Sequence, residues 1–441
     1  MVWVLWSAVP SPIKNANVGV QGTLSMKICF IADSSSIHVR RIILHLLQKG
    51  DNVLVLSSSS DRIDIPGTRT VFLLNRNEPP FNAISLKEQK RDKGFVHFVK
   101  SLVSPSLKFF LESTLKTVAL QRTWTVCIRE IQEFNPEVIY CFRTVPEGML
   151  ASKCHVRPLF LRTAGSDISQ FPKYPLYSRA IRKSLQTADV LVTESLWESK
   201  LIQDLCGHNV APKVNVIGVD TDRFRPPVSR DELRNRYGLP RDAFVVVTNR
   251  YLDKPYNGWL VLKAIESILG QNDNLVLFYA SPIKRDRQTK ERTELIVRNC
   301  PRIRFLDGPR PHSEVPDILG CGDAYISFSS VDGIPNSVLE AMACGLVPVV
   351  AELPQFHEWI EHGVNGYFVR QHDAEHLASV ISHLYRNRKG LCEMSARCVS
   401  KVRTQGSYKV CAERARDLLK QLAYRSGTEM IPTRGTAVNS G

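Results

Sequence analysis

Two acidic side chains, Asp332 and Glu340, flank the expected start of a helix. The apolar run Ala324–Phe328 ends as a buried strand, a loop with glycine and proline follows, and a helix is expected from about Asn336. Loops at the carboxyl ends of parallel strands are where α/β folds bind ligands. The amides at the helix start can face a phosphate, and a carboxylate can accept paired hydrogen bonds from vicinal hydroxyls. The pattern suits sugar or ribose recognition, although a generic strand–loop–helix unit also fits it.

Alternating strands and helices must position these side chains. Lys27–Ala32 is an expected strand, apolar residues from His38 onward recur with helical spacing, and Asp51–Leu56 is a second strand. This βαβ unit implies a parallel sheet. Further expected strands are Val138–Phe142, Leu159–Arg162, Val190–Thr193, Val214–Ile217, Phe244–Thr248, Leu275–Tyr279, Ile303–Leu306 and Val347–Val350.

The expected strands form two series that alternate with helices, one up to Val214–Ile217 and one from Phe244–Thr248 onward. They predict an α/β protein with two doubly wound domains. We expect an extension at 1–25, an N-terminal domain at 26–225 and a C-terminal domain at 226–405. A helix at 406–425 is expected to pack back across the domains, and 426–441 reads as a flexible tail. The extension lacks the features of a secretory signal, so an upstream start ahead of Met26 is the preferred interpretation.

Composition and charge narrow the function classes. The chain has 441 residues, with 58 Lys and Arg against 43 Asp and Glu, giving a formal net charge of +15. Ordinary hydrophobic content excludes a wholly disordered or collagen-like chain, and no apolar run is long enough for a spanning helix. The basic excess favours an anionic partner, but no nucleic-acid motif stands out. Eleven scattered cysteines without a C-x-x-C pair argue against a zinc site.

The segment Lys87–Lys116 interleaves basic residues with phenylalanines. Such a segment could lie on an anionic membrane surface. A solvated helix whose phenylalanines enter the local core explains the same pattern.

The stretch Asp332–Ala351 resembles the donor-binding signature of retaining glycosyltransferases of the GT-B fold, family 4 (glycosyl transferases group 1). That signature runs acidic-Gly-x-Pro and then Glu-Ala-Met-Ala-x-Gly, which appears here as Asp332-Gly333-Ile334-Pro335 and Glu340-Ala341-Met342-Ala343-Cys344-Gly345. The first acid is usually Glu in the family and is Asp332 here.

Other segments are similar to the same family. Arg250 and Lys254 follow a strand and resemble its Arg…Lys pair near the donor diphosphate. Gly165-Ser166-Asp167 resembles the Gly-x-Asp of this family, and Glu358 resembles the Glu of its later Glu…Gly-x-Asn-Gly segment. The D-x-D formed by Asp220-Thr221-Asp222 is interpreted as interdomain connector rather than a metal site.

The resemblance implies a GT-B fold, two Rossmann-like domains facing a central cleft. It implies an enzyme that moves a sugar from a nucleotide-sugar donor to an acceptor with retention, without a metal or further cofactor. The implied catalytic residues are Asp332, Arg250 and Lys254. The implied donor-binding residues are Glu340, Gly333, Ile334, Pro335, Asn336 and Glu358. His38 and Asp167 are the expected acceptor-side residues.

Several alternatives remain open from the residues alone. Arg250 could be a surface ion-pair partner, His38 a surface histidine at a helix end, and Asp167 a turn cap. The preferred role is cell-surface polysaccharide or glycolipid biosynthesis on a glycan or lipid-linked acceptor, in the cytoplasm and at the inner face of the membrane. A non-catalytic GT-B relative that binds a partner or glycan, and a sugar-nucleotide epimerase, are the rival hypotheses.

Overall fold

The computed structural model describes residues 25–74, 114–252, 255–281, 287–308, 310–333 and 336–429. The expected extension at 1–24, nearly all of the basic segment Lys87–Lys116 and the tail from 430 onward lie outside these residues. The chain divides into two compact units, and each is described separately. One unit contains residues 25–215 together with 412–429, and the other contains Val216–Cys411.

The N-terminal unit is built on a seven-stranded parallel sheet in the order β3-β2-β1-β4-β5-β6-β7. Its strands are β1 (Lys27–Ala32), β2 (Asn52–Ser57), β3 (Arg69–Phe72), β4 (Val138–Phe142), β5 (Leu159–Arg162), β6 (Val190–Thr193) and β7 (Lys213–Val214). The central strands are buried throughout because helices cover the sheet, as parallel sheets require.

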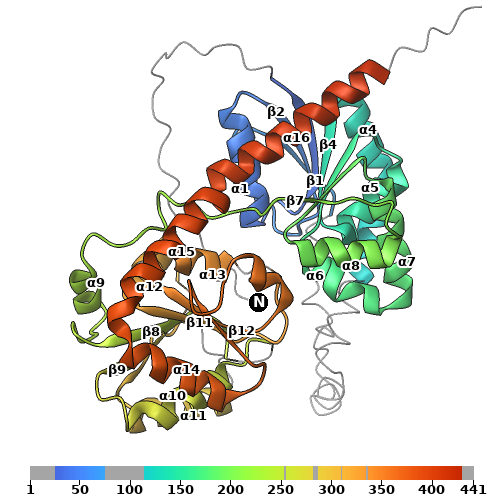
Figure 1. Cartoon of the computed structure of the whole chain (residues 1–441). Coiled ribbons are helices and arrows are strands. Elements are labelled where there is room, and N and C mark those ends of the chain that lie inside the picture. The colour runs from blue at the N-terminus through green and yellow to red at the C-terminus, as the bar shows by residue number, and fades with distance from the viewer. Residues whose placement is uncertain are drawn as a thin grey trace, which may run out of the picture. The chain divides into compact units, whose positions relative to one another are not determined.

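Helices cover both faces of this sheet (Figure 1). They are α1 (Ile37–Gln48), α4 (Trp124–Phe134), α5 (Met149–Cys154), α6 (Ser166–Ser169), α7 (Pro175–Thr187), α8 (Leu196–Cys206) and α16 (Tyr408–Glu429). One continuous apolar cluster joins the sheet to α4, α5, α7 and α8. Arg416 of α16 pairs with Asp51 at the start of β2, so the end of the chain belongs to this unit.

The C-terminal unit has a six-stranded parallel sheet in the order β10-β9-β8-β11-β12-β13. The strands are β8 (Phe244–Thr248), β9 (Leu275–Tyr279), β10 (Ile303–Phe305), β11 (Ala324–Ser327), β12 (Val347–Ala351) and β13 (Tyr367–Val369). The helices are α9 (Arg230–Arg236), α10 (Gly258–Leu269), α11 (Arg287–Asn299), α12 (Val315–Gly320), α13 (Asn336–Ala343), α14 (Ala374–Arg386) and α15 (Leu391–Gln405).

Alternate residues of each strand belong to two apolar cores, one on each face of this sheet. Val245 and Val247 pack with α9, α12, α13 and α15, whereas Phe244 and Val246 pack with α10 and α14. Successive strand residues point to opposite faces, which explains why both sets are apolar. The prediction of two α/β units with parallel sheets is confirmed.

Strands β3 and β13 have no counterpart in the sequence prediction, and two further elements differ from it. The strand expected at Val214–Ile217 ends at Val214, and Val216 packs instead in the core of the C-terminal unit. The Asn215 carbonyl accepts a hydrogen bond from Arg162 Nη1 at 2.6 Å. A side-chain donor therefore takes the place of the backbone amide that would bond to this carbonyl in a longer strand. The last helix runs from Tyr408 to Glu429, so it begins inside the expected segment 406–425 and extends beyond its C-terminal end.

Candidate active site

The strand order of the C-terminal sheet reverses between β8 and β11. From this point the chain proceeds to β9 and β10 on one side and to β12 and β13 on the other. Ligands of doubly wound sheets bind beyond the carboxyl ends of the strands at such a switch point. Arg250 follows β8 and Asp332 follows β11, so topology brings together two of the side chains selected from sequence.

Arg250 is the centre of the contacts at this position. Its Nη1 donates to Ser337 Oγ at 3.0 Å and its Nη2 donates to Ser329 Oγ at 3.3 Å. The same Nη2 forms an ion pair with Asp332. Arg250 Nε is buried and has no hydrogen-bond partner among the described residues. The guanidinium is therefore held from three sides and keeps one donor free for a ligand.

An aromatic ring and a tight loop further restrict Arg250. The Arg250 guanidinium lies 4.3 Å from the centre of the Tyr256 ring, a cation–π arrangement. The next residue, Asn257, has a left-handed backbone (φ 54°) and donates through Nδ2 to the Phe328 carbonyl at 3.0 Å and to Ser330 Oγ at 2.7 Å. These bonds tie the loop after β8 to the loop after β11.

The Asp332 carboxyl is mostly buried, with 17% of its side chain exposed. Burial raises the pKa of Asp332, and the Arg250 charge opposes that rise. Gln355, which is 1% exposed, donates through Nε2 to the Asp332 carbonyl at 2.5 Å. It thereby fixes the backbone from which the Asp332 side chain projects.

Glu340 lies in α13 and is 7% exposed. Its Oε1 is 3.1 Å from Nε2 of His312, and the His312 ring packs against Phe224 with centroids 5.3 Å apart. His312 comes from the segment between β10 and α12. The Glu340 carboxyl oxygens can accept hydrogen bonds from hydroxyl groups.

The other predicted donor-side residues are partly placed. Gly333 follows Asp332, Asn336 begins α13, and Glu358 is half-buried at the end of a short 3-10 helix. Lys254, Ile334 and Pro335 lie outside the described residues.

Sequence reasoning missed four side chains that hydrogen-bond to the predicted donor-side residues, namely Ser329, Ser337, His312 and Gln355. Ser329 and Ser337 occupy the end of a strand and the start of a helix, positions that could have identified them. His312 and Gln355 are distant in sequence and carried no such signal.

The acceptor-side predictions fall in the N-terminal unit. His38 lies in the first turn of α1 and is partly buried. Asp167 is 2% exposed, and its carboxylate accepts hydrogen bonds from the Thr144 and Ala164 amides at 2.7 and 2.9 Å. Asp167 thus holds the loops after β4 and β5 together, whatever further role it has.

A buried acid that the sequence analysis did not select lies at the switch point of the N-terminal sheet, where β1 meets β4. Glu147 follows β4 and is fully buried, and Ser58 Oγ donates to its Oε1 at 2.5 Å. Its Oε2 has no partner among the described residues. Burial raises the pKa of Glu147, although Lys116 and Arg143 oppose the shift.

A second buried acid in this unit makes stability depend on pH. Glu198 accepts hydrogen bonds from the Gly165 and Glu194 amides, and burial, followed by the Asp167 charge, raises its pKa to about 7. An unfolded Glu titrates near ~4.3. Between these values the folded chain keeps a proton that the unfolded chain has lost, so the free energy of unfolding falls as pH rises.

We expect Glu198→Gln, which stays uncharged, to remove this dependence. The free energy of unfolding of the wild type, measured relative to that of the variant, should fall by about 3 kcal/mol between pH 5 and pH 8. Urea unfolding at four pH values measures it, with the exposed Glu133→Gln as the matched control. Parallel pH curves for wild type and Glu198→Gln would contradict the assignment.

Other sequence features are structural where the chain is described. Asp220 Oδ1 accepts from the Asp222 amide at 3.2 Å in a turn, and Asp222 pairs with Lys409 at 2.6 Å. Within the described ranges, no cluster of three His, Cys, Asp or Glu side chains could hold a metal. No helix among the described residues is long and apolar enough to cross a bilayer.

Comparisons with known proteins agree with this geometry. Residues 244–387 match the family described as glycosyl transferases group 1, and this range includes Arg250, Asp332 and Glu340. The chain is 29% identical over 216 residues to D-inositol 3-phosphate glycosyltransferase 1 of Catenulispora acidiphila, covering 45% of this chain and 50% of that protein. It is 26% identical over 199 residues to the UDP-Gal:alpha-D-GlcNAc-diphosphoundecaprenol alpha-1,3-galactosyltransferase of Escherichia coli, covering 43% and 49%. The matches span about half the length of these relatives.

Solved structures establish the fold. Anabaena Alr3699/HepE in complex with UDP superimposes with a TM-score of 0.67 at 16% identity, covering 90% of this chain and all of that one. Sucrose-phosphate synthase from Thermosynechococcus elongatus superimposes with a TM-score of 0.69 at 14% identity, covering 91% and 100%. The chain has the GT-B fold of these enzymes, as its sequence predicted.

Proposed function

We propose, from the match of residues 244–387 to glycosyl transferases group 1, that the chain transfers a sugar from a nucleotide-sugar donor to an acceptor. The observation that carries this proposal is the convergence of Arg250, Asp332 and Glu340 around the switch point of the C-terminal sheet. Glu340 would bind the ribose hydroxyls, and Asp332 the donor sugar.

Charge stabilisation is the expected source of catalysis. Breaking the glycosyl–phosphate bond leaves negative charge on a diphosphate, and preset cations stabilise such a leaving group. Arg250, with its free Nε, and the amides at the start of α13 are suited to that position. We place Lys254 beside the same diphosphate.

We further propose that the reaction retains the anomeric configuration. The acceptor hydroxyl attacks the face from which the diphosphate departs and gives its proton to a departing phosphate oxygen, so no protein nucleophile is required. Proton NMR of the glycosidic product would identify the anomeric configuration of the transferred sugar. An inverted product would overturn this step.

The acceptor is proposed to be a glycan or lipid-linked molecule in polysaccharide or glycolipid assembly. Several relatives act on such molecules, including the Escherichia coli enzyme whose acceptor is a sugar on diphosphoundecaprenol. The acceptor would bind at the switch point of the N-terminal unit, near His38 and Glu147, where this unit gathers polar side chains. Peripheral contact with the inner face of the membrane belongs to the same proposal.

Nucleotide binding provides the test of the donor site. We expect UDP, GDP, ADP or CMP, each at millimolar concentration, to raise the melting temperature when it matches the donor. A ligand at 100 times its dissociation constant stabilises by about 2.7 kcal/mol. Glu340→Ala should abolish the shift, while Glu375→Ala, an exposed helix acid in the same unit, should keep it. Absence of any nucleotide shift would favour the non-catalytic alternative.

A further inference from the structure

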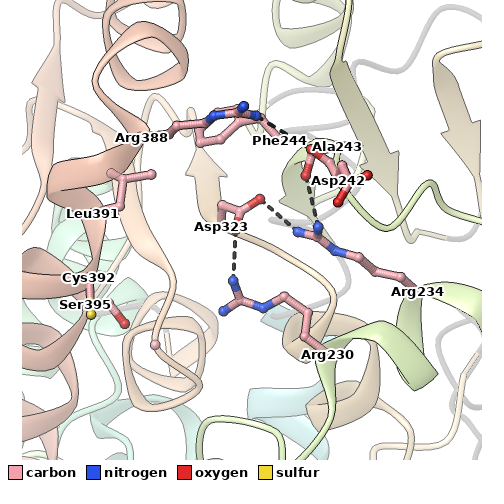
Figure 2. A pocket seen from close by; sticks show the side chains of 11 residues that line it. Arg230, Arg234, Asp242, Ala243, Phe244, Asp323, Arg388, Leu391, Cys392 and Ser395 are labelled. Atoms are coloured by element: carbon pink, nitrogen blue, oxygen red, sulfur yellow. Dashed lines mark hydrogen bonds and ion pairs between the residues drawn. The ribbon is translucent and has the colours of Figure 1, made fainter.

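A second polar pocket, with a volume of about 390 Å³, lies elsewhere in the C-terminal unit. Figure 2 shows α15 on one side, with Arg388 just before it, and α9 with Arg230 and Arg234 on the other. Asp323 lies between them, and Cys392 and Ser395 line the wall formed by α15.

This pocket lies at the amino ends of the strands, whereas the candidate active site lies at their carboxyl ends. Asp323 and Ala243 directly precede β11 and β8, whereas Arg250 and Asp332 follow these strands. Strands of four or five residues at ~3.3 Å per residue place the two edges about 15 Å apart. A ligand here would therefore not occupy the donor site.

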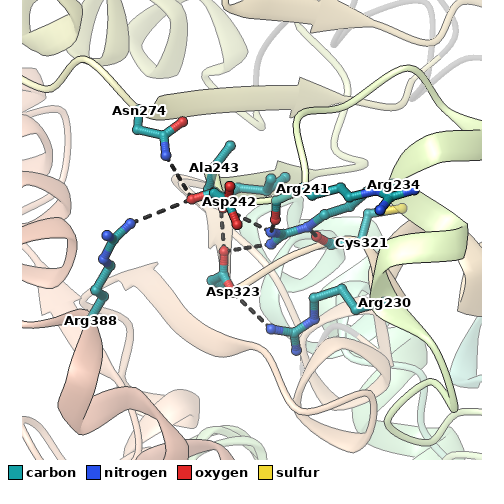
Figure 3. A network of polar contacts seen from close by, with 10 residues as sticks. Arg230, Arg234, Arg241, Asp242, Ala243, Asn274, Cys321, Asp323 and Arg388 are labelled. Atoms are coloured by element: carbon teal, nitrogen blue, oxygen red, sulfur yellow. Dashed lines mark hydrogen bonds and ion pairs between the residues drawn. The ribbon is translucent and has the colours of Figure 1, made fainter.

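The central carboxylate of the pocket, that of Asp323, is already paired with two guanidiniums. Asp323 accepts from Arg230 Nη1, from Arg234 Nη2 and from the Val245 amide, each at 2.8 Å (Figure 3). The remaining bonds of Arg234 go to the backbone carbonyls of Cys321, Arg241 and Ala243. Arg234 and Asp323 thus serve to join α9 to the starts of β8 and β11.

Two other guanidiniums keep unused donors. Within the part of the chain that the structure describes, Arg230 bonds only to Asp323, and Arg388 makes one long bond, 3.5 Å from its Nη1 to the Asp242 carbonyl. The Nε and Nη2 groups of both have no partner among the described residues. The pocket is lined by three guanidiniums and two carboxylates, and one of these carboxylates is engaged by two of the guanidiniums.

We propose that this pocket binds a phosphorylated small molecule of sugar-phosphate size. A planar guanidinium matches the oxygens of a phosphate group, and Arg230 and Arg388 present unused donors from two elements on opposite sides of Asp323 (Figure 2). The volume exceeds the need of inorganic phosphate and leaves room for a sugar ring beside it. The inference stands independently of the proposed sugar transfer, because no residue of the candidate active site contributes to the pocket.

Cys392 offers a local probe, since it is an exposed thiol in the wall of the pocket. The experiment follows its alkylation by iodoacetamide in the full chain by peptide mass spectrometry, with and without glucose 6-phosphate. A probe at twice its dissociation constant slows labelling about threefold by mass action. Glucose should not protect, and Cys300, which is outside the pocket, should react at an unchanged rate.

Arg388→Gln should abolish the protection, and it breaks only one long hydrogen bond. Lys389→Gln removes an exposed neighbouring cation that does not line the pocket and should keep the protection. Loss in Arg388→Gln with retention in Lys389→Gln supports the site. Absence of protection by glucose 6-phosphate, equal protection by glucose, or protection that persists in Arg388→Gln overturns it.

Discussion

Under the proposed sugar transfer, Arg250→Gln is expected to lower kcat/KM by about 10²–10³-fold, because it would remove the preset cation that we propose faces the leaving group. The variant also leaves Asp332 without its ion-pair partner in a mostly buried position, so donor-sugar binding should weaken too. Steady-state kinetics with the donor identified by the nucleotide screen measures both effects. Arg250→Lys should recover little, since an ammonium cannot reproduce the fork that reaches Ser329, Ser337 and Asp332 together.

The matched control for this prediction is Arg236→Gln. Arg236 lies in the same unit, is 60% exposed and pairs with Asp317 at the surface. Activity within about twofold of wild type is expected, because exposed ion pairs contribute little. Equal losses in the Arg250 and Arg236 variants would show a general charge effect and would count against a leaving-group role.

Arg416→Met is expected to destabilise the N-terminal unit by about 3–5 kcal/mol. Arg416 Nε and Nη2 donate to the two Asp51 carboxylate oxygens at 2.8 and 2.9 Å, and both side chains are almost fully buried. The substitution leaves the Asp51 charge buried, with the Met26 amide as its remaining hydrogen-bond donor among the described residues. Urea unfolding gives the loss, and hydrogen exchange should show faster opening of α16.

Glu413→Gln provides the comparison one turn away on α16. Glu413 pairs with Lys49 and is 39% exposed, so its loss should cost less than about 1 kcal/mol. Asp51→Leu combined with Arg416→Met should regain part of the stability, because no buried charge then remains unpaired. A small effect of Arg416→Met alone, similar to that of Glu413→Gln, would contradict the buried ion-pair account.

Local sequence patterns predicted most of the elements and selected the candidate donor segment. Apolar runs between helical periodicities predicted β1, β4, β5, β6, β8 and β9 at the observed limits. They succeeded because buried parallel strands are almost wholly apolar. The glycine, proline and acidic residues around Asp332, with Glu340 in the following helix, marked the candidate ligand-binding turn because such positions need particular residue types.

Only the tertiary structure decided which side chains meet. Strand order places the loops after β8 and β11 side by side, which gives Arg250 its partners Ser329 and Ser337. The same holds for His312 beside Glu340 and for Arg416 on Asp51, pairs far apart along the chain. Helical and strand periodicities report which face of an element is buried but carry no information on the element that covers it. Contacts between distant segments therefore arise from topology and packing. The residue pattern alone did not contain this information.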